Sequence, residues 1–123
     1  TRRCALHPAL TLIRFATDLE AQLQRARVVI GMCGYNTFSE ILTFRKRALV
    51  LPRQYPRQEQ FLRARVGAAH GVLACLHEEG DVHTLARQIT EAWDAPRPPA
   101  SVTEPLLHGL STLVEDARVW LNA

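Results

Sequence analysis

Short runs of apolar residues alternate along the chain with segments whose apolar residues recur every three or four positions. The runs occupy residues 10–15, 27–30, 48–51 and 71–76. Each run is apolar at almost every position, as in strands that are covered on both faces in a parallel sheet, whereas a half-exposed strand would alternate with polar residues. The pattern therefore predicts four short parallel strands.

Helix signals stand between and after these runs. Residues 17–20 form a capping box, Asn36 or Thr37 can cap a helix after a glycine turn, another helix is predicted over about 58–69, and Asp81 precedes a strongly periodic segment. The stripes of the second and fourth helices are Phe38, Ile41 and Leu42, and Val82, Leu85, Ala86, Ile89, Ala92 and Trp93. Strands alternating with helices predict an α/β fold, a Rossmann-like parallel sheet with helices on both faces.

Proline residues divide the chain near residue 95. Residues 95–100 cannot continue a helix, so we interpret 95–102 as a linker between an α/β domain at 1–94 and a C-terminal helix at 103–123. The stripe predicted for that helix is made by Leu106, Leu110, Leu113, Val114, Ala117 and Leu121. Residue 1 is Thr rather than Met, which fits a processed chain, a cloned domain or a piece of a longer protein, and we favour a piece.

Composition narrows the class of protein. The chain has 123 residues, 47% of them hydrophobic, which suits one domain with a real core. The apolar runs are far shorter than the roughly 18 residues of a membrane span. The cysteines Cys4, Cys33 and Cys75 have neither disulfide-framework nor zinc-ligand spacing, so we expect a reducing cytoplasm and no structural metal. The histidines His7, His70, His77, His83 and His108 are scattered without ligand spacing.

Positive charge gathers in the middle of the chain, although the net charge is only +3. Residues 45–65 hold a single acid, Glu59, beside a set of cations that consists of Arg45, Lys46, Arg47, Arg53, Arg57, Arg63 and Arg65. Such a segment suits an anionic partner, either nucleic acid or a phosphorylated small molecule. Cations that simply keep helix faces in water explain the same segment without any partner.

The first candidate site is the segment 31–40, where a glycine turn leaves a predicted strand and opens a helix. Free amides in the first turn of a helix carry partial positive charge that suits phosphate, and glycine lets the backbone come close. The segment matches neither the GxGxxG fingerprint nor a P-loop, and its glycines can also serve packing alone. Glu40 could bind ribose hydroxyls, or it could close a capping box with Thr37.

The second candidate site is the segment 52–60, which follows the third run and precedes a helix. It collects Arg53, Glu59 and Gln60 at the carboxyl end of a predicted strand, where ligands of α/β sheets bind. Arginine, carboxylate and amide side chains can bind phosphate and sugar hydroxyls. A polar, proline-stiffened loop that leads into a helix is the simpler interpretation.

Three motifs together resemble a known family. The pattern G-Y-N-T-x-S-E after a strand, then L-P-R, then E-Q-x-x-R-A, is similar to the carboxy-terminal donor-binding domain of GT-B glycosyltransferases, closest to family 28 and its MurG-like group, over about residues 10–88. The resemblance implies that Gly34, Asn36 and Thr37 lie against the donor diphosphate and nearby ribose. It also implies that Glu40 binds the ribose hydroxyls, that Glu59 and Gln60 contact the transferred sugar, and that Arg53 lines the donor cleft.

The resemblance also implies an enzymatic activity. It implies a hexosyltransferase that moves a sugar from a nucleotide diphosphate sugar, with a UDP-sugar favoured, to an acceptor hydroxyl. No cofactor or metal is expected, and no Asp-x-Asp motif occurs. The family's glycine-rich loop near the first strand is not visible here, and neither is its amino-terminal acceptor domain, which carries the general base. We therefore expect the isolated chain to be inactive, and leave membrane association of the full-length protein open.

Other functions fit some of the same residues. A nucleotide-sugar epimerase shares the GT-B architecture, and a catalytically inactive relative would keep the motifs. A basic Rossmann-like module could instead bind nucleic acid or nucleotide through residues 45–65, but the chain lacks a recognisable DNA-reading helix and a basic strand rich in aromatics. Binding of nucleic acid should fall steeply with salt and should not depend on Glu40.

Overall fold

The computed structural model describes residues 7–76, 80–108, 118–119 and 122. Its centre is a parallel sheet of three strands in the order β1-β2-β3, namely β1 (Val28–Gly31), β2 (Arg47–Val50) and β3 (Ala74–Cys75). Val29 of β1 pairs with Ala48 of β2, and Leu49 of β2 pairs with Ala74 of β3. The predicted α/β fold with a Rossmann-like parallel sheet is confirmed.

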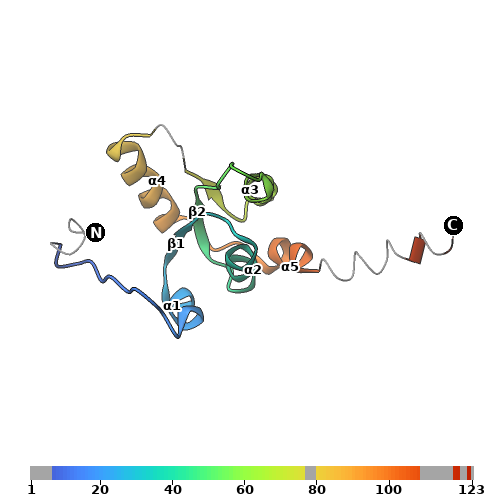
Figure 1. Cartoon of the computed structure of the whole chain (residues 1–123), viewed down its shortest axis with the longest axis horizontal. Helices are drawn as coiled ribbons and strands as arrows, with labels where there is room; N and C mark the ends of the chain where they lie inside the picture. The colour runs from blue at the N-terminus through green and yellow to red at the C-terminus, as the bar shows by residue number, and fades with distance from the viewer. Residues whose placement is uncertain (1–6, 77–79, 109–117, 120–121, 123) are drawn as a thin grey trace.

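Helices cover the sheet on both faces. They are α1 (Leu19–Arg25), α2 (Tyr35–Thr43), α3 (Glu59–Ala69), α4 (Val82–Asp94) and α5 (Ala100–Leu107). Figure 1 shows α4 on one side of the strands and α2 with α5 on the other, while α1 lies at the end where β1 begins. All three strands run away from α1, so their carboxyl ends gather at the opposite end of the sheet.

The core lies between the sheet and the helices α2 and α3. Val50 of β2 is fully buried and packs in one cluster with Ile41 and Leu42 of α2 and Ala64 of α3. Phe38, which packs against this cluster, stands three and four residues before Ile41 and Leu42, so α2 docks on the sheet through one apolar stripe. The cluster holds the carboxyl end of β1 and the start of α2 in a fixed relation.

Two of the predicted strands are corrected. Residues 10–15 form no strand, and Leu10, Leu12, Ile13 and Phe15 are each more than half exposed. An isolated strand is not stable without a neighbour to satisfy its backbone groups, and this run has none among the described residues. The fourth run forms only the two-residue β3, because Gly71 turns with φ of 71° and the pairing starts three residues later.

The C-terminal helix begins earlier than predicted. Helix α5 begins at Ala100, three residues earlier than expected, because the carbonyl of Pro99 accepts the first hydrogen bonds, from the amides of Val102 and Thr103. Pro105 lies inside the helix rather than at its start. Beyond His108, the predicted stripe of this helix, with Leu110, Leu113, Val114, Ala117 and Leu121, falls outside the described residues, as do Cys4, His77 and Trp120.

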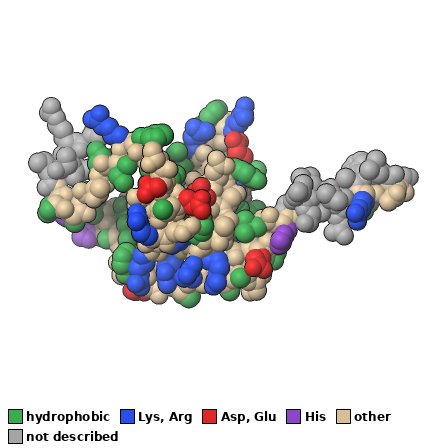
Figure 2. Space-filling view, turned by 90° about the horizontal axis from the view of Figure 1, so that it is seen from below, with side chains coloured by type: hydrophobic (Ala, Val, Ile, Leu, Met, Phe, Trp, Pro, Cys, Tyr) green, Lys and Arg blue, Asp and Glu red, His purple; other side chains and the backbone are tan. Residues whose placement is uncertain are grey.

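The extended segment 95–99 is tied to the sheet. The Nε atoms of Arg45 and Arg47 donate to the carbonyls of Pro98 and Ala95, and Arg97 donates through Nη2 to the carbonyl of Phe44 at 2.8 Å. Figure 2, which views the molecule from the side of α1, shows Lys and Arg side chains gathered in a row on this face. Because these hydrogen bonds hold the segment 95–99 against the start of β2, we call it the strap.

Helix α4 begins as the sequence predicts. The carboxylate of Asp81 accepts a hydrogen bond from the amide of Thr84 at 2.8 Å. The stripe of α4 is not buried, however, because Val82 is 79%, Leu85 42% and Trp93 47% exposed. At α1 the expected capping box is absent, since Asp18 is the cap residue and its side chain makes no capping bond.

We expect the stability contribution of the Asp81 cap to depend on pH. The backbone hydrogen bond from Thr84 holds the pKa of Asp81 below its ordinary value of 3.8. A depressed carboxyl pKa contributes stability that is complete above 3.8 and is lost as the pH falls through the folded-state pKa. In thermal unfolding, the Tm of the wild type should fall relative to the Tm of Asp81→Asn as the pH drops below 4. The reason is that Asn caps the helix without titrating. A constant difference from pH 6 to pH 2.5 would contradict the assignment.

No helix among the described residues is long and apolar enough to cross a membrane.

Candidate functional site

The glycine turn at the carboxyl end of β1 continues directly from the sheet. The carbonyl of Gly31 accepts a hydrogen bond from the amide of Leu51 at 2.8 Å, so β1 and β2 stay paired up to the turn. Cys33 then takes a left-handed conformation with φ of 66° and buries its side chain completely. Burial raises the pKa of the Cys33 thiol, which keeps it protonated near neutral pH. The thiol is a packing group that holds the turn.

The first turn of α2 presents uncapped amides to open space. Gly34 is the cap residue, its carbonyl accepts from the amide of Phe38 at 2.9 Å, and no side chain of the described residues caps the helix. A Cβ added at Gly34 would meet nothing within 4 Å. The backbone here, with φ of −60°, does not require glycine either, so what glycine provides is room. An anion could approach the amides of residues 35–37 without displacing protein atoms.

The expected caps and the capping box of Glu40 are corrected. The helix begins at Tyr35, so Asn36 and Thr37 are its second and third residues and neither is the cap. Glu40 therefore lies too far into the helix to reach back to a cap amide. Its carboxylate makes no hydrogen bond or ion pair with any described residue. A capping box therefore does not explain why an acid stands at this position.

Helix geometry places Glu40 above the uncapped turn. Asn36 and Glu40 are four residues apart, which puts them on the same side of α2, away from the stripe of Phe38, Ile41 and Leu42. Side chains of a helix lean toward its N-terminus, so the carboxylate is carried back toward the mouth of the glycine turn. Glu40 is half-buried rather than fully exposed. Four of the predicted site residues thus share one end of one helix.

The second predicted segment is closed by a hydrogen bond of its own. The amide of Arg53 donates to Oε1 of Gln60 at 3.0 Å, which ties the loop after β2 to the first turn of α3. Gln60 therefore has a structural role at its carbonyl oxygen, while its amide nitrogen keeps two donors for a ligand. Glu59 and Arg53 are exposed.

Arg63 connects the two segments. Its Nη1 donates to the carbonyl of Cys33 at 3.0 Å, and its guanidinium lies 5.7 Å from the centre of the Tyr35 ring. It stands one turn after Gln60, so α3 holds both the loop and the glycine turn. From the sequence, Arg63 is the arginine of E-Q-x-x-R-A and one of the cations of residues 45–65, but it is not among the predicted site residues. The signal was its place one turn after two candidate residues on the same helix.

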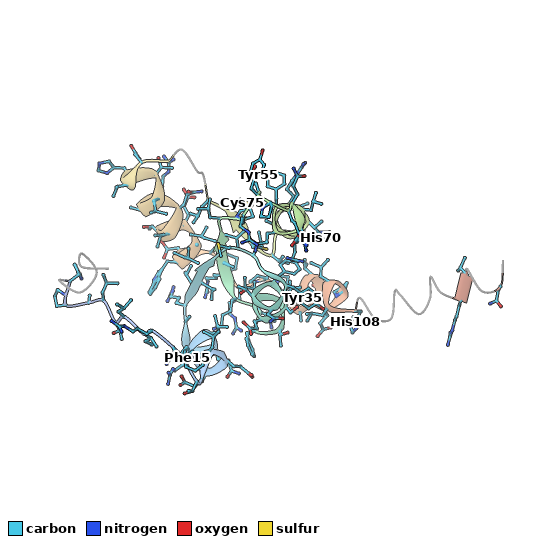
Figure 3. The ribbon with its side chains drawn as sticks, viewed as in Figure 1. Phe15, Tyr35, Tyr55, His70, Cys75 and His108 are labelled. Atoms are coloured by element: carbon cyan, nitrogen blue, oxygen red, sulfur yellow. The ribbon has the colours of Figure 1, made fainter. Side chains whose placement is uncertain are left out.

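A pocket of about 410 Å³ opens beside the glycine turn, lined by Met32, Leu51, Pro52, Arg53, Gln54 and Tyr55. In Figure 3, Tyr55 stands at the end of the sheet where Cys75 of β3 lies, on the far side from α1. Arg53 is the predicted site residue that lines this pocket. The pocket and the first turn of α2 therefore belong to the carboxyl end of the sheet, where α/β folds bind ligands.

We expect Arg63→Met to loosen the site. The variant keeps the alkyl chain but loses a hydrogen bond to a partly buried carbonyl, and such charge-assisted bonds contribute about 1.5–3 kcal/mol. Urea unfolding should show that loss of stability, while Arg65→Met, which removes an exposed neighbour on the same helix lying 5.9 Å from the Phe61 ring, should change it by less than about 1 kcal/mol. Equal effects of the two variants would remove the special role of Arg63.

Comparison with known proteins gives one match. A model of the glycosyltransferase family 28 C-terminal domain matches residues 2–109. No curated protein and no solved structure matches the chain. The matched range includes both candidate segments and the strap.

Proposed function

Because this chain belongs to glycosyltransferase family 28, as a C-terminal domain of that family, we propose that it binds a nucleotide diphosphate sugar at the carboxyl end of its sheet. The observation that carries the proposal is the uncapped first turn of α2, with open space at Gly34 and, one turn further on, an acid that has no partner among the described residues. Amides suit a diphosphate, and a carboxylate suits the paired hydroxyls of a ribose.

Each candidate residue then has a position in the proposed complex. The amides after Gly34, with the side chains of Asn36 and Thr37, receive the diphosphate and the nearby ribose, and Glu40 accepts hydrogen bonds from the ribose hydroxyls. Arg53, Glu59 and the free amide nitrogen of Gln60 face the transferred sugar. The pocket beside Arg53 gives that sugar space.

The chemistry assigned to this domain is stabilisation of the leaving group. In the transfer, the bond between the sugar's anomeric carbon and the diphosphate oxygen breaks, and a bond from the acceptor oxygen to that carbon forms. The electron pair stays on the departing nucleoside diphosphate. The amides and the dipole of α2 are placed to stabilise that growing negative charge.

The finer points of the proposal concern the whole enzyme. We propose a metal-independent hexosyltransferase of the MurG-like group, acting in the cytoplasm on a UDP-sugar. The general base and the acceptor site are assigned to a separate amino-terminal domain. Residues 1–94 are assigned to donor binding. On this basis the isolated chain binds a donor and transfers nothing.

Calorimetric titration with UDP tests the proposal. We expect saturable binding with a dissociation constant of about 1 mM or tighter, which corresponds to about 4 kcal/mol. Uridine should bind far more weakly, because it lacks the diphosphate. Binding that falls steeply with salt and responds equally to UDP and to any oligonucleotide would instead favour the nucleic-acid alternative.

A further inference from the structure

A cluster of cations lies where β2 begins, at the end of the sheet opposite the proposed donor site. It surrounds a cavity of about 410 Å³ lined by Gln24, Thr43, Phe44, Arg45, Lys46 and Arg97. Three segments of the chain meet there: the end of α1, the turn from α2 into β2, and the strap 95–99. Figure 2 looks at this end of the molecule and shows the row of Lys and Arg side chains on it. The donor site proposed above lies beyond the carboxyl ends of the strands and shares no residue with this cavity.

Lys46 is a buried cation without a carboxylate. It is only 9% exposed, and its Nζ donates to the carbonyls of Gln24 and Ala26 at 2.5 and 2.8 Å. An ammonium has three donors, so one is left for a group in the cavity. Burial lowers the pKa of Lys46, and the charges of Arg97 and Arg47 lower it further. The charged ammonium of Lys46 is thus held by neutral backbone carbonyls and lies near two further positive charges, those of Arg97 and Arg47.

The arginines beside it are arranged in the same way. Arg97 donates to the carbonyls of Phe44 and Arg45, and Arg45 donates through Nε to the carbonyl of Pro98. Each of these side chains uses some of its five donors on backbone oxygens and keeps the rest. Among the described residues, none of the three cations that line the cavity forms an ion pair.

The acid that hydrogen-bonds to Gln24, a residue lining the cavity, forms no ion pair with the cations. Glu20 accepts a long bond of 3.4 Å from the side chain of Gln24, and it forms no ion pair with Lys46, Arg45 or Arg97. The backbone holds the cations in place, so their positions do not depend on an acid partner. Preorganised positive groups around an open cavity favour binding of an anion, because their side chains lose little further conformational entropy when the anion binds.

We propose that this cavity, formed by Lys46, Arg45 and Arg97, binds a phosphate group. The forked guanidinium donors match phosphate oxygens, and the ammonium supplies a point charge beneath them. The phosphate can come from a lipid headgroup or from a soluble phosphate compound, since both present the same oxygens. Binding here is independent of the donor site.

Amide chemical shifts of the wild-type chain test the proposal without any variant. Pyrophosphate at up to 10 mM in 0.15 M salt should shift the signals of residues 43–47 and of Gln24 in a saturable way. Shifts at residues 34–37 report the donor site and are counted separately. If residues 43–47 do not respond, the proposal is overturned, whatever happens at the donor site.

A matched pair of variants tests the assignment of residues. Arg97→Gln should weaken the pyrophosphate response of residues 43–47 by about tenfold, as expected for loss of one charge-assisted contact. Arg87→Gln removes the same charge from an exposed position on α4 and should change it less than about twofold. Equal weakening by both variants would show a general effect of net charge and would overturn the site.

Vesicles distinguish the two sources of phosphate. Vesicles of phosphatidylglycerol should retain the wild-type chain more than vesicles of phosphatidylcholine, and pyrophosphate should release it, if the ligand is a headgroup. A pyrophosphate response without retention on phosphatidylglycerol assigns the site to a soluble phosphate. Both results support the cavity, and retention that Arg97→Gln leaves unchanged counts against it.

Discussion

Glu40→Gln is expected to weaken UDP binding at least tenfold while leaving the Tm unchanged. Charge-assisted hydrogen bonds contribute about 1.5–3 kcal/mol each, and the account gives the Glu40 carboxylate the ribose hydroxyls as partners. The fold should not respond, because this carboxylate makes no hydrogen bond or ion pair with any described residue. Calorimetry with UDP measures the affinity, and circular dichroism measures the Tm.

The control for this prediction is Glu104→Gln. Glu104 is an exposed acid on α5, so the substitution changes the net charge by the same amount without touching the glycine turn. It should leave the affinity for UDP within about twofold, because Glu104 is an exposed charge that belongs to neither candidate segment. An unchanged affinity in Glu40→Gln would remove the acid from the ribose site.

Gly67→Ala is expected to lower the free energy of unfolding by about 1–3 kcal/mol. A Cβ at Gly67 would lie 2.8 Å from Cδ2 of Leu73 and 3.1 Å from Cε2 of Phe38, so α3 would have to move away from the core. Alanine is the better helix former by about 1 kcal/mol, which opposes the effect but does not outweigh a clash with two closely packed neighbours. Urea unfolding measures the difference.

A double-mutant cycle makes this prediction specific. Leu73→Ala removes Cγ and Cδ2, the two atoms closest to a Cβ at Gly67, and leaves only Cε2 of Phe38 at 3.1 Å, so the additional cost of Gly67→Ala should be clearly smaller in that background. If the two effects simply add, close packing of Gly67 against Leu73 does not limit stability, and the reason for a glycine here lies elsewhere.

The sequence predicted those elements of the fold whose neighbours are close along the chain. The second and third apolar runs became β1 and β2, and α3 and the Asp81 cap of α4 lie where expected, because local spacing and capping determine them. Residues 10–15 failed because a strand needs a pairing partner, which a local pattern cannot supply. The strap 95–99 was interpreted as a linker because the arginines that hold it are about fifty residues away in sequence.

The candidate site was predicted in its composition but not in its local bonding. The glycine turn and the residues of α2 came from the motif. The start of the helix at Tyr35, which frees Glu40 from a capping role, depends on the backbone of Gly34 and could not be seen in a pattern that offers several caps. Arg63 was missed because its partner is a backbone carbonyl, and no residue type at Cys33 signals such a contact.

Amide chemical-shift mapping of the wild-type chain with UDP tests the central proposal most directly. We expect UDP to cause saturable amide shifts at residues 34–40 and smaller shifts at Arg53, Glu59 and Gln60. Unchanged signals at residues 34–40 with several millimolar UDP would contradict it.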